Sequence, residues 1–247
     1  MTRAPASAPT SAPLARILST TPPSAYALLS RAGRDDLEVL IGDVVDVELL
    51  ADIPLVDAHG TPREVLALVP YRQVRERGYR AHDDGAPLRC LVVTERQSLP
   101  RTDALALLPD TGEPDTGELD VQGTGFDVSD ADYAAIVQRV IDGEIGRGEG
   151  ANFVIRRDYR ATTSTPHDRL APQLMRRLLE RESGAHWTFA IVTPGLALVG
   201  ASPERHVSVQ HGTVTMNPIS GTYRHPASGP DRAGFLDFLG DVKEVEE

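Results

Sequence analysis

The residue types that could do chemistry are concentrated towards the end of the sequence. Glu204 lies in "GASPER", where Gly200, Ser202 and Pro203 predict an irregular turn between two strands. A carboxylate held on such a turn can act as a general acid, or it can be an ordinary exposed turn residue. The residues by themselves leave both interpretations open.

Two further carboxylates occur together in the final stretch "DVKEVEE". Glu244 and Glu247 are three residues apart, so on a helix they share one face, whereas Glu246 points to solvent. Two carboxylates on one face repel each other unless a cation or solvent lies between them, and Mg²⁺ prefers carboxylate oxygens. The pair therefore predicts either a magnesium site or a solvated acidic helix end.

Small and uncharged polar residues mark two other positions. Asn152, in "EGANFVIRR", places an amide at the start of a predicted strand, where it could orient a ligand or cap the preceding glycine-rich turn. In "MNPISGTYR" (216–224), Ser220, Gly221 and Thr222 follow an apolar run that ends at Pro218. Such residues at a strand end favour polar contacts.

The composition narrows the class of protein. The chain has 247 residues, 40% of them hydrophobic, and a formal net charge of -11, which argues against unspecific nucleic-acid binding because phosphate binding needs a positive surface. The single cysteine, Cys90, excludes a disulfide within the chain and reads as a buried strand residue. No stretch approaches the roughly 18 apolar residues of a membrane span. We therefore expect a cytoplasmic protein with no membrane or nucleic-acid partner.

The elements that must position the candidate residues are clearest in the second half. Helical spacing begins after Ser129 or Asp130, and a second amphipathic helix has Pro172 in its first turn. Strands are expected at 151–157, 186–194, 196–204, 206–212 and 213–220, with His211–Gly212 as a tight turn, followed by a third helix from Pro230. This pattern predicts an α+β fold, with antiparallel sheets packed against helices.

The first half is less regular. We expect a disordered tail over 1–19, a helix over 20–33, a hairpin around Gly42, a helix over 61–79 interrupted at Pro70, a strand over 87–94 and a helix over 99–110. The Gly-, Asp-, Thr- and Pro-rich stretch that follows predicts a linker. The predicted organisation is an amino-terminal region over 20–112, a linker over 113–125 and a second domain over 126–247.

Four stretches together carry a family resemblance. "FDVSDADYAAIVQRVIDGEIGRGEGANFVIRR", "LALVGASPERHVSV", "TVTMNPISGTYR" and "FLGDVKEVEE" resemble, in order and approximate spacing, the chorismate-utilising enzymes. The region from "SAYALLSRAG" to "ADIPL" is also similar to the amino-terminal part of the anthranilate synthase component I branch. The resemblance extends over roughly residues 20–247 and is nearest to the phenazine-type enzymes that make 2-amino-2-deoxyisochorismate or anthranilate.

The resemblance implies Mg²⁺-dependent chemistry on chorismate in which ammonia adds at C2 and the C4 hydroxyl leaves. It implies that Glu204 is the general acid, that Glu244 and Glu247 bind Mg²⁺, and that Gly221 and Thr222 contact the substrate. An acid of this kind must start protonated, and burial beside a second carboxylate would favour that state. Whether pyruvate is then eliminated stays open.

Two positions distinguish branches of the family. Water-adding members carry a lysine base where this sequence has Asn152, and neutral ammonia needs no such base. Members that aminate at C4 carry a nucleophilic lysine where this sequence has Ser220. Both departures favour amination at C2, in an anthranilate or phenazine-type pathway, with ammonia supplied by a glutamine amidotransferase domain or subunit.

The resemblance also predicts what the sequence lacks. The family's carboxy-terminal half has no counterpart here, so we expect a truncated and incomplete fold that is inactive alone, and a homodimer is left open for the complete protein. The segment before "GASPE" gives no support for tryptophan feedback. Two alternatives remain: a catalytically dead homologue that acts as a binding or regulatory subunit, and an isochorismate synthase.

Overall fold

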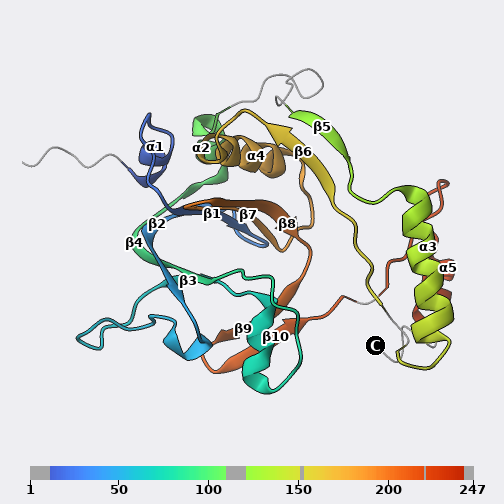
Figure 1. Ribbon diagram of the computed structural model, residues 1–247. Coiled ribbons are helices and arrows are strands. Elements are labelled where there is room, and N and C mark those ends of the chain that lie inside the picture. Colours follow the sequence, from blue (N-terminus) through green and yellow to red (C-terminus); the bar gives the residue numbers. More distant parts are fainter. Residues whose placement is uncertain (1–11, 110–120, 151–152, 220, 242–247) are drawn as a thin grey trace, which may run out of the picture.

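The computed structural model describes residues 12–109, 121–150, 153–219 and 221–241 (Figure 1). Its helices are α1 (Pro13–Ile17), α2 (Arg101–Leu107), α3 (Asp130–Val140), α4 (His167–Arg181) and α5 (Arg232–Leu239). Shorter turns of 3₁₀-helix cover Leu50–Asp52 and Tyr71–Arg77, and a π-helical turn, Ile141–Ile145, continues α3.

A six-stranded sheet forms the centre of the structure, in the order β3-β4-β2-β1-β7-β8. Every neighbouring pair is antiparallel. The strands are β1 (Tyr26–Arg31), β2 (Asp36–Val47), β3 (Val65–Leu68), β4 (Leu88–Pro100), β7 (Trp187–Thr193) and β8 (Leu196–Ser202). Two separate ribbons complete the strands: β5 (Val121–Phe126) with β6 (Tyr159–Thr163), and β9 (Arg205–Gln210) with β10 (Thr213–Asn217). The predicted α+β class with antiparallel sheets is confirmed.

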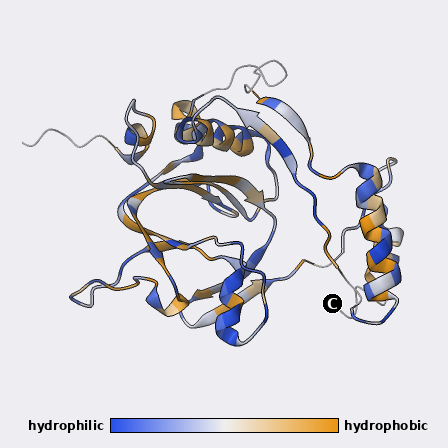
Figure 2. Cartoon of the chain, viewed as in Figure 1, coloured by the Kyte–Doolittle hydropathy of each residue, from blue (hydrophilic) through white to orange (hydrophobic). Residues whose placement is uncertain are grey.

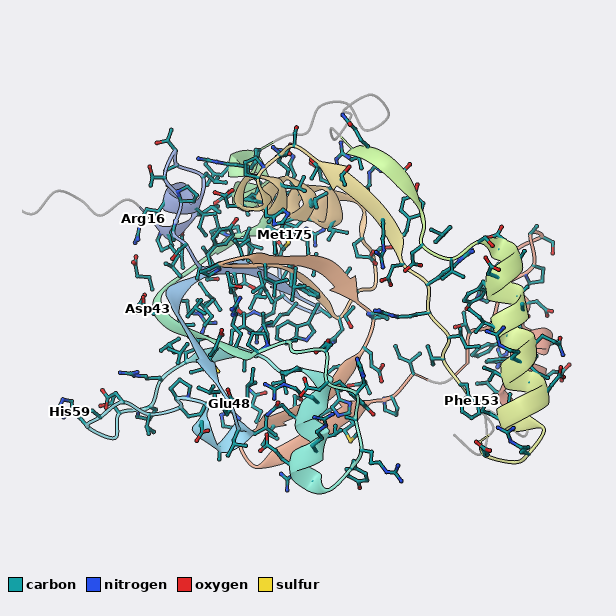
Figure 3. All side chains as sticks on the ribbon, in the orientation of Figure 1. Arg16, Asp43, Glu48, His59, Phe153 and Met175 are labelled. Atoms are coloured by element: carbon teal, nitrogen blue, oxygen red, sulfur yellow. The ribbon has the colours of Figure 1, made fainter. Side chains whose placement is uncertain are left out.

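Helices α1, α2 and α4 cover one face of this sheet. Leu14 and Ile17 of α1 and Met175 of α4 pack with strand residues such as Leu28 in a single buried cluster. Figure 3 shows Met175 between α4 and the sheet, and Figure 2 shows hydrophobic residues along the strands that α4 covers. Because α1 lies inside the range predicted as a disordered tail, that prediction is wrong for residues 12–19.

Pro172 lies inside α4, not in its first turn, since the helix begins five residues earlier, at His167. A proline has no N–H, so the carbonyl of Asp168, four residues earlier, loses its partner within the helix. The hydroxyl of Tyr26 on β1 donates to that carbonyl at 2.9 Å. Burial raises the pKa of Tyr26, which keeps its donor proton in place. One long-range hydrogen bond thus repairs the helix and fastens it to the sheet.

The opposite face of the sheet is also apolar. It carries Leu29, Leu40, Leu91 and Ile191, with Phe189 packed against them. At one end of this face the buried carboxylate of Glu38 is surrounded by guanidinium groups, with N–O distances of 2.8 to 3.4 Å, from Arg96, Arg31 and Arg34. Removing a carboxylate from water is costly, and these guanidinium groups offset part of that cost.

The first half contains the main departures from the sequence predictions. The segment predicted as a helix over 20–33 contains β1, which pairs with β2 on one side and β7 on the other. Its continuous apolar run is compatible with a helix or with a strand buried on both faces, and only the neighbours decide between them.

The predicted hairpin around Gly42 is instead one long strand, β2, paired along its length with β4. Its register shifts between Ile41 and Gly42, which marks a bulge. A Cβ at Gly42 would lie 2.0 Å from the carbonyl oxygen of Val92, so glycine marks a close backbone approach and not a turn.

Three smaller predictions also need correction. The predicted helix over 61–79 is β3 followed, after Pro70, by the 3₁₀ turn Tyr71–Arg77. Residues 121–125 of the predicted linker form most of β5, which is held by pairing with β6. Residues 153–157 of the predicted strand are irregular, and the strand β6 begins at Tyr159. Strand pairing over long sequence distances decides each of these.

The remaining predicted elements are confirmed. The strand containing Cys90, the helix after Pro100, α3 with Ser129 as its cap, and strands β7 to β10 all form. Cys90 is fully buried, and this burial raises the pKa of its thiol. A buried thiol with a raised pKa is a poor nucleophile, which agrees with the predicted role of a buried strand residue. Over the ranges described, none of the helices is both long and apolar enough to span a bilayer.

Candidate functional site

Glu204 lies in the short connection between β8 and β9. The hydroxyl of Ser202 organises this turn: it accepts a hydrogen bond from the amide N–H of Glu204 at 3.3 Å and donates to the carbonyl of Glu204 at 3.2 Å. The side chain of Glu204 is exposed. The backbone position is therefore fixed locally, but the burial expected for a protonated acid is not provided by the residues that the structure describes.

The β9–β10 ribbon determines what lies near Glu204. Arg205, the first residue of β9, pairs with Asn217, the last residue of β10, and its guanidinium Nε donates to Asn217 Oδ1 at 3.1 Å. Antiparallel pairing puts the start of one strand beside the end of the other. Glu204 and the Pro218–Ile219 segment thus leave the ribbon at the same end, opposite the predicted His211–Gly212 turn, which is confirmed with φ angles of 50° and 80°.

The segment after β10 continues through the two predicted substrate-contacting residues. Gly221 is partly buried and Thr222 is exposed, whereas Ser220 lies outside the described residues. The structure therefore brings the turn of Glu204 and the stretch that leads to Gly221 and Thr222 to one end of a single ribbon. Their arrangement provides a carboxyl group, a backbone without a side chain and a hydroxyl group.

Tyr223 anchors this stretch to α5. Its ring packs edge-on against Phe235, with centroids 5.5 Å apart, and lies near Phe238 at 5.6 Å. Its hydroxyl donates to the carbonyl of Asp231 at 3.4 Å, and burial, with the negative charge of Asp231, raises the pKa of Tyr223. The stretch that contains Gly221 and Thr222 is consequently coupled to α5 through one aromatic side chain.

The first turn of α5 fits beneath Tyr223 because residue 234 is glycine. Asp231 caps the helix by accepting a hydrogen bond from the N–H of Gly234 at 3.1 Å. A Cβ at Gly234 would lie 2.5 Å from Asp231 Oδ2 and 2.6 Å from the hydroxyl of Tyr223. Any larger residue must therefore displace both the capping carboxylate and the tyrosine hydroxyl.

The predicted magnesium ligands and Asn152 lie outside the described residues. Glu244 and Glu247 follow α5 in sequence, so α5 is the last described element before them. Among the residues that the structure describes, no group of three or more His, Cys, Asp or Glu side chains could hold a metal ion.

The stretch after Asn152 is held against α3. Tyr133 of α3 donates to the carbonyl of Ile155 at 2.7 Å. The guanidinium of Arg157 lies 3.9 Å from the ring centre of Phe126 and forms an ion pair with Asp130 at 2.5 Å. Arg156 is exposed by comparison, with 84% of its side chain accessible against 23% for Arg157.

Two supporting residues escaped the sequence analysis. Tyr223 and Gly234 each hold a part of the candidate site, and neither was singled out from the sequence, whereas Ser202 was recognised as part of the turn at Glu204. The sequence "DRAG" after Pro230 does contain a signal, since Asp231 three residues before Gly234 fits a helix cap. The contact of Tyr223 with α5 has no comparable signal.

Comparison with known proteins shows which family this chain belongs to. The sequence profile described as chorismate binding enzyme matches residues 59–247, which is more than half of the chain. The chain belongs to the chorismate binding enzyme family.

Within the chorismate binding enzymes, the chain is similar to named relatives along most of its length. It is 48% identical over 237 residues to the phenazine-specific anthranilate synthase of Pseudomonas chlororaphis, and 47% identical to the enzyme of that name from Pseudomonas fluorescens. Both matches include 94% of this chain but 36% of the relative. Anthranilate synthase component 1 of Mycolicibacterium smegmatis is 28% identical over 207 residues, or 81% of this chain. The chain thus spans about a third of the length of these relatives.

A solved structure shares the fold. It is described as a 2,3-dihydroxybenzoate-specific isochorismate synthase from Bacillus anthracis, with a TM-score of 0.58 and 18% sequence identity. The match includes 94% of this chain and 59% of the solved chain. At this identity the likeness establishes the architecture, and the chemistry has to be argued from the site.

Proposed function

We propose that this chain forms part of an aminating chorismate enzyme of the phenazine-specific anthranilate synthase type. The observation that carries the proposal is the 48% identity to such an enzyme over 94% of the chain. The ribbon geometry supports it, since Glu204 and the stretch containing Gly221 and Thr222 leave the same end of β9–β10. The proposed reaction adds ammonia at C2 of chorismate and expels the C4 hydroxyl.

The roles of the residues follow from their chemistry. Glu204 donates a proton to the departing C4 hydroxyl, which leaves as water; the ammonium group formed at C2 then loses a proton to solvent, and uptake of a proton from solvent restores the acid form of Glu204. Gly221 allows the backbone to approach the substrate closely, and the hydroxyl of Thr222 can donate to or accept from it. The product is 2-amino-2-deoxyisochorismate, and elimination of pyruvate from it would give anthranilate.

Ammonia is favoured over water as the nucleophile by the residue type at position 152. The amide of Asn152 cannot remove a proton, so water would not be activated there, whereas neutral ammonia already carries a lone pair. The ammonia would come from a glutamine amidotransferase domain or subunit. Cys90 is fully buried and has no role in such a step.

Magnesium fits the donor set proposed for it. Carboxylates are the ligands that Mg²⁺ prefers, and Glu244 and Glu247 would hold it next to α5. When bound, the ion would neutralise and orient a carboxylate of the substrate. The Tyr223 contact with α5 would then place these two acids relative to Gly221 and Thr222.

A chimera tests the function. Residues 1–247 replace the matched segment of the Pseudomonas chlororaphis relative, and the purified protein is incubated with chorismate, Mg²⁺ and isotopically labelled ammonium. We expect a labelled product by mass spectrometry, and its loss when the metal is chelated.

The other outcomes decide among the rivals. If the product is an unlabelled isomer of chorismate, the reaction is isochorismate synthesis and not amination. Binding of chorismate without turnover would favour a catalytically dead homologue. Turnover by residues 1–247 alone would overturn the prediction that this chain is inactive by itself.

A further inference from the structure

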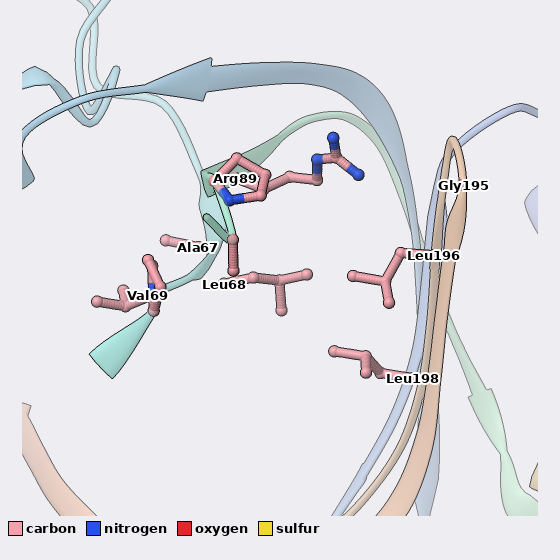
Figure 4. A pocket seen from close by; sticks show the side chains of 10 residues that line it. Ala67, Leu68, Val69, Arg89, Gly195, Leu196 and Leu198 are labelled. Carbon is pink, nitrogen blue, oxygen red and sulfur yellow. The ribbon is translucent and has the colours of Figure 1, made fainter. Parts of the chain in front are cut away.

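Two hollows in the surface of the structure differ in their chemistry. The larger, of about 590 Å³, is lined mainly by aliphatic side chains such as Leu68, Leu196 and Leu198 (Figure 4). The smaller, of about 350 Å³, lies at the end of β1 and is lined mainly by polar residues and backbone. We call it the polar pocket, and it is formed by residues 30–34, Arg101, residues 182–185 and Thr188.

Two hydroxyl groups form the floor of the polar pocket. Ser30 of β1 and Thr188 of β7 are opposite each other in the sheet, two residues from Leu28 and Ala190 of the buried cluster, so they share the helix-covered face. Each is only 7% exposed. Among the residues that the structure describes, neither hydroxyl has a hydrogen-bond partner. Polar groups buried to this extent normally have one, so the two hydroxyls offer paired donors to an occupant of the pocket.

Arginine side chains give the polar pocket its charge. Arg31 and Arg34 form ion pairs with acidic residues of β2. Arg101 donates to the carbonyl of Leu179, but none of the described carboxylates forms an ion pair with it. Glu182, the one acidic residue in the lining, is exposed. In a chain with a formal net charge of -11, the pocket therefore places an unpaired guanidinium beside two buried hydroxyls.

Backbone hydrogen bonds between its walls hold the polar pocket in shape. The N–H of Arg101 donates to the carbonyl of Asp35 at 3.1 Å, which joins the start of α2 to the connection between β1 and β2. The N–H of Ala32 donates to the carbonyl of His186 at 2.9 Å, which joins the same connection to the residues before β7. Walls that are fixed before binding lower the entropic cost of holding a ligand.

We propose that the polar pocket binds a small oxyanion, of the phosphate or carboxylate class. Hydroxyl groups donate to the oxygens of such an anion, and the guanidinium of Arg101 has further N–H groups that match them. A cation would be repelled by the arginines, and an apolar ligand would leave both hydroxyls unpaired. Because Glu204, Gly221 and Thr222 lie outside the pocket lining, the inference does not rest on the proposed function.

Nuclear magnetic resonance titrations of ¹⁵N-labelled residues 1–247 with inorganic phosphate, and separately with acetate, test the proposal. Chloride at the same ionic strength is the control, because it supplies negative charge without oxygen acceptors. We expect saturable shifts of the amide signals of Gly33 and Gly184, on two sides of the pocket, with phosphate or with acetate. Saturation by only one of the two anions would assign the site to that class, and saturation by both would assign it to their shared oxyanion chemistry.

Matched variants locate the site. Arg101→Met removes the charge and should raise the dissociation constant about tenfold or more, whereas Thr188→Val removes one hydroxyl and should raise it about threefold or more. Arg77→Met changes an exposed arginine outside the pocket and should leave it unchanged.

Urea denaturation separates lost binding from lost structure. Without added anion, Thr188→Val should unfold at the same urea concentration as the unsubstituted chain. The rise in midpoint that phosphate or acetate gives the unsubstituted chain should be reduced in this variant.

Four results would overturn the proposal. The first is an absence of saturable shifts with both anions, which would leave the hydroxyls to solvent, and the second is equal shifts with chloride. The third is equal weakening by Arg77→Met. The fourth is binding that persists unchanged in both Arg101→Met and Thr188→Val, because the anion would then lie elsewhere on the chain.

Discussion

The helix-covered side of the sheet and the site-bearing elements β9, β10 and α5 are built differently. The first is a closed core in which Tyr26, Leu28 and Met175 are fully buried. None of the residues of β9, β10 or α5 that the structure describes is buried. The core is closed by buried contacts of its own, whereas the described residues of the elements that carry the candidate chemistry lie at the surface.

The largest effect is expected on catalysis and not on stability. Glu204→Gln removes the transferable proton and should lower turnover of the chimera by about 10²- to 10⁴-fold. Because Glu204 is exposed, the denaturation midpoint of the variant should equal that of the unsubstituted protein. Steady-state rates and urea titrations of the same preparations provide the comparison, and unimpaired turnover would remove Glu204 from its assigned role.

Truncating a side chain in the core should instead change stability. Leu28→Ala leaves a cavity in a fully buried cluster and should lower the free energy of unfolding by about 2–5 kcal/mol. Val209→Ala, at an exposed position of the ribbon, should change it by less than about 0.5 kcal/mol. Urea denaturation measures both, and similar losses at the two positions would contradict the contrast between the regions.

The next effect concerns the hydrogen bond that replaces the missing helical partner at Pro172. Tyr26→Phe leaves the partly buried carbonyl of Asp168 without its donor and should cost about 1–3 kcal/mol of unfolding free energy. Tyr223→Phe, in the site-bearing region, removes a longer and more exposed hydrogen bond and should cost less. An unchanged free energy of unfolding in Tyr26→Phe would mean that the carbonyl of Asp168 does not depend on Tyr26.

Within the site-bearing region, the contact between Tyr223 and α5 can be tested through two glycines. Gly234→Ala forces a Cβ against Asp231 and Tyr223 and should destabilise α5 by about 1–3 kcal/mol. Gly240→Ala meets backbone oxygens at 3.5 and 3.6 Å, an ordinary contact, and serves as the matched control. Amide hydrogen exchange in α5 reports the difference, and equal exchange in both variants would contradict the predicted crowding.

The smallest effect is a pH dependence at the edge of the core. Hydrogen bonds from Arg34 and Ser98 lower the pKa of Asp36 to about 2. The unfolded value is near 4, so ionised Asp36 stabilises the fold above about pH 4, and this contribution is lost as the pH falls towards 2. Because the pair is partly exposed, we expect less than about 1 kcal/mol. Asp36→Asn should flatten stability between pH 4 and 2, and an unchanged slope would contradict this.

Local sequence patterns predicted much of the fold. The spacing of apolar residues in α3 and α4, the alternation in β7 to β10 and the His211–Gly212 turn were all readable, because each depends on neighbours within a few residues. The motifs around Glu204 and Thr222 pointed to the family in the same way, and the profile match to residues 59–247 confirms that resemblance. The sequence by itself therefore determined the class, the family and the candidate residues.

Tertiary structure decided the rest, because it depends on pairs far apart in the chain. Whether 26–31 becomes a helix or a strand is settled by β2 and β7, and Gly42 is a bulge only because Val92 lies against it. Pro172 is tolerated because Tyr26 supplies the missing donor from 146 residues away. No local pattern contains these partners. The tertiary structure also placed Glu204 beside the stretch leading to Gly221 and Thr222, since strand pairing, and not sequence spacing, brings the two ends of a ribbon together.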